Sequence, residues 1–164
     1  MVRKDDRACE GNQVWSAQEF SGRDDWIHVL SENALRDIDI AINRIRARGD
    51  KLEDVAAGDF DLPSLSNDLS EIKQILEKGR GFVLIKGLGN AGYGEEELGL
   101  AFWGIGTHLG TGVSQSFRGD RLGHVRDLGE KDRYYTAGGE LEMHMDPTDI
   151  AGLLCVQPSE TGGL

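Results

Sequence analysis

"ELEMHMDPTDIAGLLCVQPSETGGL", residues 140–164, is the stretch that decides which kind of sheet this chain is expected to build. Alternation along an extended strand places His144 and Asp146 on one face, together with the two glutamates before them. Pro147 then ends strand pairing, because proline has no backbone N–H to donate. The apolar run at residues 150–156 predicts a further strand. The stretch therefore predicts two short strands, the first of which carries an imidazole and a carboxylate side by side.

The spacing of His144 and Asp146 predicts half of a metal site. Two residues of one strand face are about 7 Å apart along the backbone, so both side chains can reach one ion. One histidine and one carboxylate, completed by a second histidine, form the facial triad of Fe(II) sites and leave coordination positions open. Structural zinc instead favours four ligands rich in cysteine and histidine. The pair therefore favours Fe(II).

Before residue 110 the sequence is largely helical. Apolar residues recur at helical spacing over residues 35–45 and 65–76, and a third helix is expected over residues 95–109. Ser31 or Asn33 can cap the first helix and Gly49 suits its end, while Pro63 and Gly79 bound the second. The third helix contains three glycines, which predicts close packing against a neighbour. "GFVLIKG", residues 81–87, predicts a short buried strand.

The two ends of the chain lack the helical sequence pattern of these segments. Residues 1–30 are polar and irregular, with Trp15, Phe20 and Trp26 expected to pin this arm to a surface. After residue 110, short segments such as "GVSQSF", "LGHVRDL", "LEMHMD" and "IAGLLCV" predict strands joined by turns. The expected fold class is α+β, helical first and β second, in one domain over residues 1–164.

Composition limits the partners and the compartment. The formal net charge of −11 argues against nucleic acid, whose binding rests on clustered Lys and Arg. The longest apolar runs are far too short to cross a bilayer, which predicts a soluble, cytoplasmic protein with no membrane partner. Cys9 and Cys155 predict free thiols, with Cys155 in the core.

The remaining histidines and the glycine-rich stretch have simpler interpretations. "GIGTHLGTG" follows a helix instead of a strand and lacks the frame of a phosphate loop, so helix packing and a loop are expected. His108, near a helix end, is expected to cap or pack. His124 is expected to be buried and hydrogen-bonded, with a catalytic role as the less favoured alternative.

Several stretches of the chain resemble a known family. "GRGFVLIKGL", "AFWGIGTHLG", "VSQSFRGDRLGHVRDLG", "RYYTAGG" and "ELEMHMDPTDIAGLLCVQPSETGG" are similar to the TauD/TfdA-like branch of Fe(II)/2-oxoglutarate-dependent dioxygenases. The resemblance covers nearly the whole chain. It implies a double-stranded β-helix, a relative of the jelly roll, with helices packed outside. Residues 1–80 would form the arm and helices, and residues 81–164 the strand, a helix and the first jelly-roll strands.

The resemblance also implies a reaction and its site residues. His144 and Asp146 would be iron ligands, 2-oxoglutarate and dioxygen would be co-substrates, and a small organic substrate would be hydroxylated. Substrate-side candidates are Gln115, Arg133, Tyr135 and Thr136. Relatives carry a distal histidine and a 2-oxoglutarate-binding arginine downstream, yet residues 147–164 contain neither residue type. The chain thus resembles the front half of such an enzyme and is expected to be inactive by itself.

Two other hypotheses stay open from the sequence. The chain could be a non-catalytic fragment or interaction module of that family, because an unfinished sheet leaves strand edges and apolar faces for a partner or a second copy. It could also be a small complete metalloenzyme with His124 as the third ligand beside His144 and Asp146.

Overall fold

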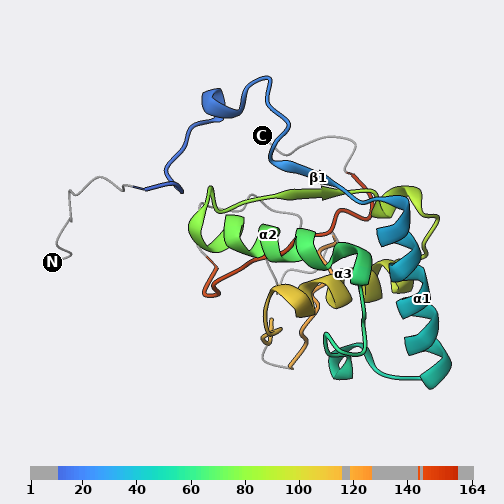
Figure 1. The fold of residues 1–164 in the computed structure, drawn as a ribbon. Coiled ribbons are helices and arrows are strands. Elements are labelled where there is room, and N and C mark those ends of the chain that lie inside the picture. The colour runs from blue at the N-terminus through green and yellow to red at the C-terminus, as the bar shows by residue number, and fades with distance from the viewer. Residues whose placement is uncertain (1–10, 116–118, 127–143, 145, 159–164) are drawn as a thin grey trace, which may run out of the picture.

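Three helices and one small sheet make up the regular structure of the part of the chain that the structure describes (Figure 1). The computed structural model describes residues 11–115, 119–126, 144 and 146–158. The helices are α1 (Glu32–Arg48), α2 (Ser66–Lys78) and α3 (Glu95–Leu109), and the strands are β1 (Ile27–Val29) and β2 (Leu84–Lys86). Short 3-10 turns precede or join them at Ala17–Phe20, Leu52–Asp54, Pro63–Leu65 and Leu88–Asn90. The mixture agrees with the predicted α+β class.

Helix α1 begins and ends where the sequence predicts. The Ser31 side chain accepts a hydrogen bond from the Ala34 N–H, and Gly49 ends the helix in the left-handed conformation, with φ of 69°. Three residues of the predicted stripe, Ile38, Ile42 and Ile45, are 2% exposed or less, and the fourth, Leu35, is half-buried against the same core. Helix α2 likewise follows a 3-10 turn that begins with Pro63, and it ends at Gly79.

Helix α3 packs closely on the rest of the core at Gly104, as predicted, whereas Gly99 and Gly106 have room for a Cβ atom. A Cβ atom on Gly104 would lie 2.3 Å from the ring of Phe60, which is fully buried. The neighbouring Trp103 donates its indole N–H to the Val55 carbonyl at 2.9 Å. His108 confirms the predicted packing role, since its Nε2 lies 2.7 Å from the Phe60 carbonyl oxygen. Only glycine at residue 104 allows the Phe60 ring to sit against the α3 backbone.

The sheet contains a strand that the sequence does not predict. β1 and β2 pair in parallel, with His28 opposite Ile85, and α1 and α2 form the connection between them (Figure 1). β1 lies inside the stretch expected to be irregular. The prediction of a buried strand for β2 is wrong in part: Leu84 is 40% exposed and only Ile85 faces the core. Leu84 and Lys86 share the opposite face of β2, and both are exposed to solvent.

An aromatic arm, residues 11–26, is fastened to the start of β2. The rings of Trp15, Phe20 and Trp26 all contact Phe82, with centroid distances of 4.7, 5.0 and 6.0 Å. This confirms that the aromatic residues anchor the arm.

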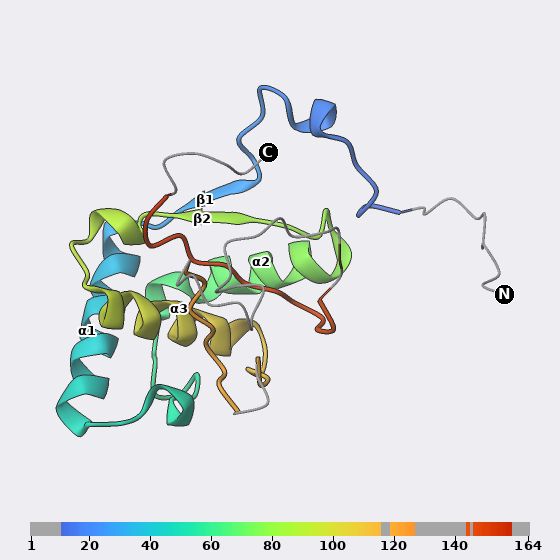
Figure 2. The ribbon, with the colours of Figure 1, turned by 180° about the vertical axis from the view of Figure 1, so that it is seen from behind.

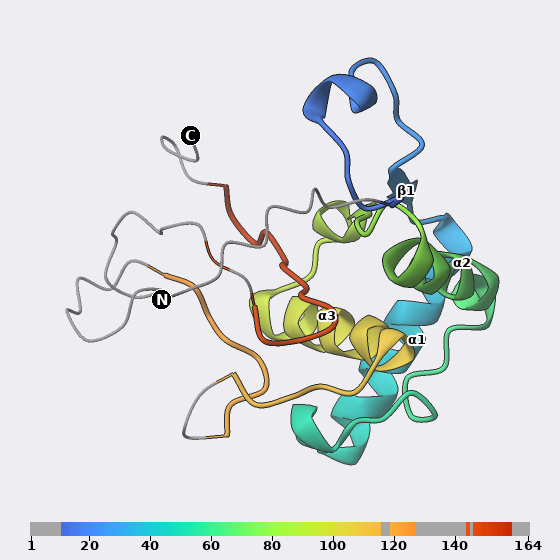
Figure 3. The same ribbon diagram turned by 90° about the vertical axis from the view of Figure 1, so that its left-hand side faces the viewer.

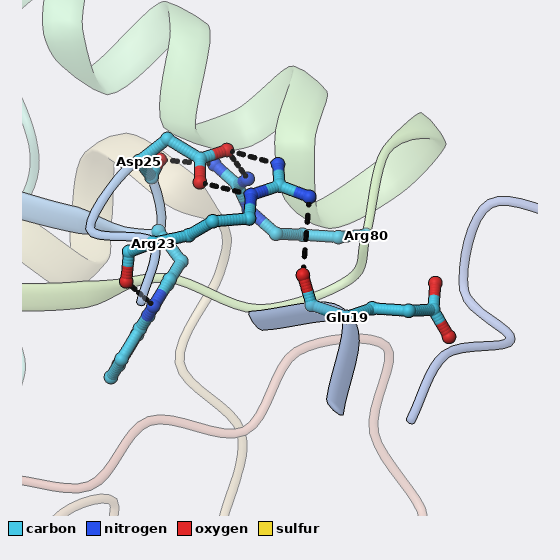
Figure 4. A network of polar contacts seen from close by, with 5 residues as sticks. Glu19, Arg23, Asp25 and Arg80 are labelled. Carbon is cyan, nitrogen blue, oxygen red and sulfur yellow. Dashed lines mark hydrogen bonds and ion pairs between the residues drawn. The ribbon is translucent and has the colours of Figure 1, made fainter. Parts of the chain in front are cut away.

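Asp25 adds a polar clamp to the same junction (Figure 4). Its carboxylate accepts two hydrogen bonds from Arg23, at 2.9 and 2.7 Å, and one from Arg80 at 2.8 Å. The Arg80 side chain also donates to the Asp25 carbonyl. The bonds from Arg23, opposed by partial desolvation and aided by Arg80, lower the pKa of Asp25 to about 2.

The described residues after α3 are extended but contain no β-strand. Residues 146–158, here called the C-terminal segment, run beside α3 (Figures 2 and 3), where a Cβ on Gly152 would lie 3.1 Å from the Phe102 ring. No backbone hydrogen bond joins residues 150–156 to another described residue. The strand predicted at residues 150–156 is therefore absent, because an extended segment without a hydrogen-bonded neighbour is not a strand.

Two side chains predicted to be buried are exposed in this part of the chain. Cys155, expected in the core, is an exposed free thiol, and the His124 side chain is 61% exposed. Both predictions assumed pairing of the strands that carry these residues, and that pairing is absent among the described residues.

No helix in the described ranges is long and apolar enough to cross a membrane. The cytoplasmic location and the absence of a membrane partner stay predictions.

Candidate metal centre

His144 and Asp146 lie close enough to act on one ion. The His144 Nε2 atom is 3.9 Å from the Asp146 Oδ1 atom. The two side chains are 52% and 58% exposed. Although no strand is present at these residues, the side chains of residues 144 and 146 converge, as alternation predicts.

The local sequence places this pair at the start of the C-terminal segment. Residues 147–149, "PTD", form a bend directly after Asp146. Proline at residue 147 fixes its own φ angle and restricts the conformation of Asp146 to extended forms. The bend separates the metal pair from the apolar residues 150–156, which pass alongside α3.

The structure does not assemble a third ligand beside the pair. Within the ranges that are described, no group of three or more His, Cys, Asp or Glu side chains could hold a metal ion. His124 instead lies with its Nδ1 atom 3.4 Å from Glu95 at the start of α3. The small complete metalloenzyme with His124 as third ligand is therefore not supported by the arrangement of these side chains.

One of the four substrate-side candidates lies among the described residues. Gln115 is exposed, and its side chain donates to the Val113 carbonyl at 3.1 Å, while its backbone N–H donates to the Asp120 carbonyl at 2.6 Å. The second of these bonds holds residue 115 beside residue 120. Arg133, Tyr135 and Thr136 fall outside the described residues, so their roles stay predictions.

Glu95 holds residues 119–126 against α3, a contact that sequence reasoning missed. Its carboxylate accepts a hydrogen bond from Arg126 and lies beside His124. Arg121 donates to the Glu53 carbonyl at 3.4 Å and fastens the same segment to the turn after α1. Glu95 and Arg126 are 31 residues apart, and charged residues are too common in this chain for such a pairing to be read from sequence.

Comparison with known proteins supplies the family. The profile described as "Taurine catabolism dioxygenase TauD, TfdA family" matches residues 47–164, a range that includes His144 and Asp146. The chain belongs to the TauD/TfdA family. The resemblance noted in its sequence motifs is thus confirmed, and the family points to a dioxygenase-like enzyme.

Two curated relatives extend this assignment. The chain is 30% identical over 159 residues to "FR-33289 synthase" of Streptomyces rubellomurinus. It is 27% identical over 163 residues to "Taurine hydroxylase-like protein SAT17" of Stachybotrys chartarum. The alignments cover 93% and 92% of this chain but only 47% and 42% of the relatives. The chain therefore spans less than half the length of either TauD/TfdA relative.

Proposed function

We propose that this chain is part of an Fe(II)- and 2-oxoglutarate-dependent dioxygenase that hydroxylates a small organic substrate. His144 and Asp146 are two of its iron ligands in this proposal. The observation that carries it is the 3.9 Å approach of the His144 Nε2 and Asp146 Oδ1 atoms inside the range matched by the family profile.

The donor set fits a divalent iron ion as far as the described residues extend. Imidazole nitrogen and carboxylate oxygen are two donors of the facial triad. Metal–nitrogen and metal–oxygen bonds of about 2.0–2.2 Å place two adjacent donors of a facial triad about 3 Å apart. The two donors in this chain are 3.9 Å apart, so the side chains would rotate toward each other to bind one ion from adjacent positions.

The protein residues would supply binding and orientation in this reaction. When bound, iron with 2-oxoglutarate and dioxygen supplies the oxidising power for hydroxylation. His144 would bind the ion through an imidazole nitrogen, and Asp146 would contribute a negative charge that partly offsets the cation. Gln115, Arg133, Tyr135 and Thr136 are proposed to contact the substrate. A jelly roll around the iron is part of the same proposal.

The 164-residue chain is proposed to be inactive by itself. Residues 147–164 contain no histidine and no arginine, so they offer neither a third imidazole ligand nor a guanidinium for the far carboxylate of 2-oxoglutarate. The proposal places those two groups in additional polypeptide, such as the portion by which the relatives exceed this chain.

Formation of succinate from 2-oxoglutarate tests the function. A form extended to the length of the relatives is expected to produce succinate when Fe(II) and dioxygen are present, whereas the 164-residue chain is not. Single changes His144→Ala and Asp146→Ala in the extended form should abolish turnover, and His124→Ala should retain it. Succinate formation that survives both ligand changes would contradict the proposal.

A second candidate, a non-catalytic interaction module, is favoured by one observation. Leu153 is 92% exposed and Val156 is 54% exposed, on a segment whose backbone makes no hydrogen bond to another described residue. Such a segment can add a strand from a partner or a second copy. Sedimentation of the purified chain distinguishes the candidates: a monomer over a wide concentration range argues against self-association, and Leu153→Asp should dissolve any oligomer.

A further inference from the structure

A hollow of about 670 Å³ lies between the end of α1, the following turn, the start of α3 and residues 122–124. Ile45, Leu52, Leu100 and Leu122 form its apolar wall. Neither His144 nor Asp146 lines it, so it is separate from the candidate metal centre. The volume falls within the range of about 300–1,000 Å³ that is usual for sites that bind small molecules.

Gly99 lines the hollow at a position where a small side chain would fit. A Cβ atom at residue 99 would lie 3.4 Å from Leu122 and 4.0 Å from Leu52, which are ordinary van der Waals contacts. Alanine would therefore fit there, unlike at Gly104, where Phe60 leaves no room. Glycine inside a helix costs about 1 kcal/mol relative to alanine. What it provides at residue 99 is additional depth in the hollow.

The rim of the hollow carries an excess of negative charge. Asp50, Glu95 and Glu96 line it, against Arg46 and His124. Most of these charges are already paired. Arg46 forms an ion pair with Glu97 at 2.6 Å, and Asp50 forms one with Arg48. The Glu95 carboxylate lies beside both Arg126 and His124. Glu96 takes part in no ion pair among the residues that the structure describes. A ligand that enters the hollow therefore meets apolar walls and one unneutralised carboxylate.

We propose that this hollow binds a small organic amine, with the apolar body of the ligand against Leu52, Leu100 and Leu122 and its ammonium group beside Glu96. Charge and shape both favour this class of ligand: an ammonium group can pair with Glu96, whereas an anion would be repelled by it and a neutral molecule would gain no ion pair. The site goes beyond the proposed dioxygenase function and does not depend on it.

Nuclear magnetic resonance titration of the 164-residue chain tests the proposal without metal or 2-oxoglutarate. The probes are 2-phenylethylamine, its neutral analogue 2-phenylethanol and the anion 3-phenylpropionate. The amine is expected to shift the backbone amide signals of Leu52, Gly99 and Leu100 and to bind about three- to fivefold more tightly than the alcohol. The anion should bind most weakly. Equal affinity for all three probes, or shifts located elsewhere, would overturn the proposal.

Variants separate the apolar part of the site from its charge. Gly99→Leu fills the hollow and should weaken amine binding at least tenfold, while Gly99→Ala weakens it less and raises the thermal midpoint. Glu96→Gln should reduce the preference for amine over alcohol to near unity, and the matched change Glu71→Gln on α2 should not. Because Gly99→Ala and Glu96→Gln preserve packing, they decide the outcome even if Gly99→Leu unfolds. Unchanged amine binding in both variants would refute the site.

Discussion

The helical part of the chain and its C-terminal segment differ in how completely their apolar side chains are buried and their backbone groups are hydrogen-bonded. Over residues 27–109, capped helices bury a continuous apolar core in which Ala34, Ile38 and Phe60 are fully buried. In the C-terminal segment, Leu153 and Val156 face solvent and the backbone of residues 150–156 has no hydrogen-bonded neighbour among the described residues. The two parts have similar apolar runs in sequence, so hydrophobicity alone does not separate them.

The difference bears on where the candidate functional residues lie in the chain. A helix closes its own backbone hydrogen bonds, so α1, α2 and α3 need only side-chain packing from their surroundings. A strand needs another strand, and its burial depends on residues far away in sequence. The candidate iron ligands, His144 and Asp146, lie on the part that depends on such neighbours. Their half-exposed side chains fit a site that further polypeptide would complete and shield.

The largest expected effect that distinguishes the two parts is on stability. Phe60→Ala removes a fully buried ring packed on Gly104 and should lower the free energy of unfolding by about 3–5 kcal/mol. Leu153→Ala removes a side chain that is 92% exposed and should change it by no more than about 0.5 kcal/mol. Urea denaturation of both variants beside the unaltered chain gives the two values.

Similar losses of unfolding free energy in Phe60→Ala and Leu153→Ala would contradict the difference between the two parts of the chain. They would mean that Leu153 is buried in solution, in an oligomer or against a surface of the same chain. Repeating the denaturation at several protein concentrations distinguishes these cases, because only the oligomer responds to concentration.

A smaller effect is expected from Asp25, which fastens the aromatic arm to the helical part. The pKa of Asp25 is lowered from an ordinary 3.8 to about 2 by its hydrogen bonds with Arg23 and Arg80. The folded state therefore favours the ionised form: this stabilisation is fully present above the unfolded pKa and is lost as pH falls through about 2. Asp25→Asn should lower the thermal midpoint at neutral pH and flatten its dependence between pH 4 and pH 2.

The neighbouring change Asp24→Asn is the control, since no ion pair of the described residues includes Asp24. It should leave both the midpoint and its acid dependence as they are in the unaltered chain. An Asp25→Asn profile that runs parallel to that of the unaltered chain would show that the clamp does not couple to folding.

The sequence was sufficient for the helices because their signals are local. Ser31 caps the first turn of α1 and Gly49 ends it in the left-handed conformation, both within the helix they bound. The 3.6-residue spacing of Ile38, Ile42 and Ile45 needs no information from the rest of the chain. The predicted bounds of α3, residues 95–109, agree with the structure for the same reason.

Features that depend on distant residues were missed or misjudged. β1 has only three residues, too few for a pattern to be seen, and its pairing with β2 joins residues that are far apart. Cys155 was expected in the core because its neighbours are apolar, yet its thiol is exposed and no strand among the described residues covers it. At the candidate site, the convergence of His144 and Asp146 follows from alternation along the chain. The contacts of Glu95 and the hollow beside Gly99 could not be predicted, because they involve segments that only the fold brings together.

Anaerobic titration of the 164-residue chain with Fe(II), followed by calorimetry, tests the central claim about His144 and Asp146 most directly. Single changes His144→Ala and Asp146→Ala are each expected to weaken binding at least about tenfold, while His124→Ala and the nearby control Asp149→Asn leave it unchanged. Unchanged affinity in a chain that carries both His144→Ala and Asp146→Ala would contradict the assignment of this pair as iron ligands.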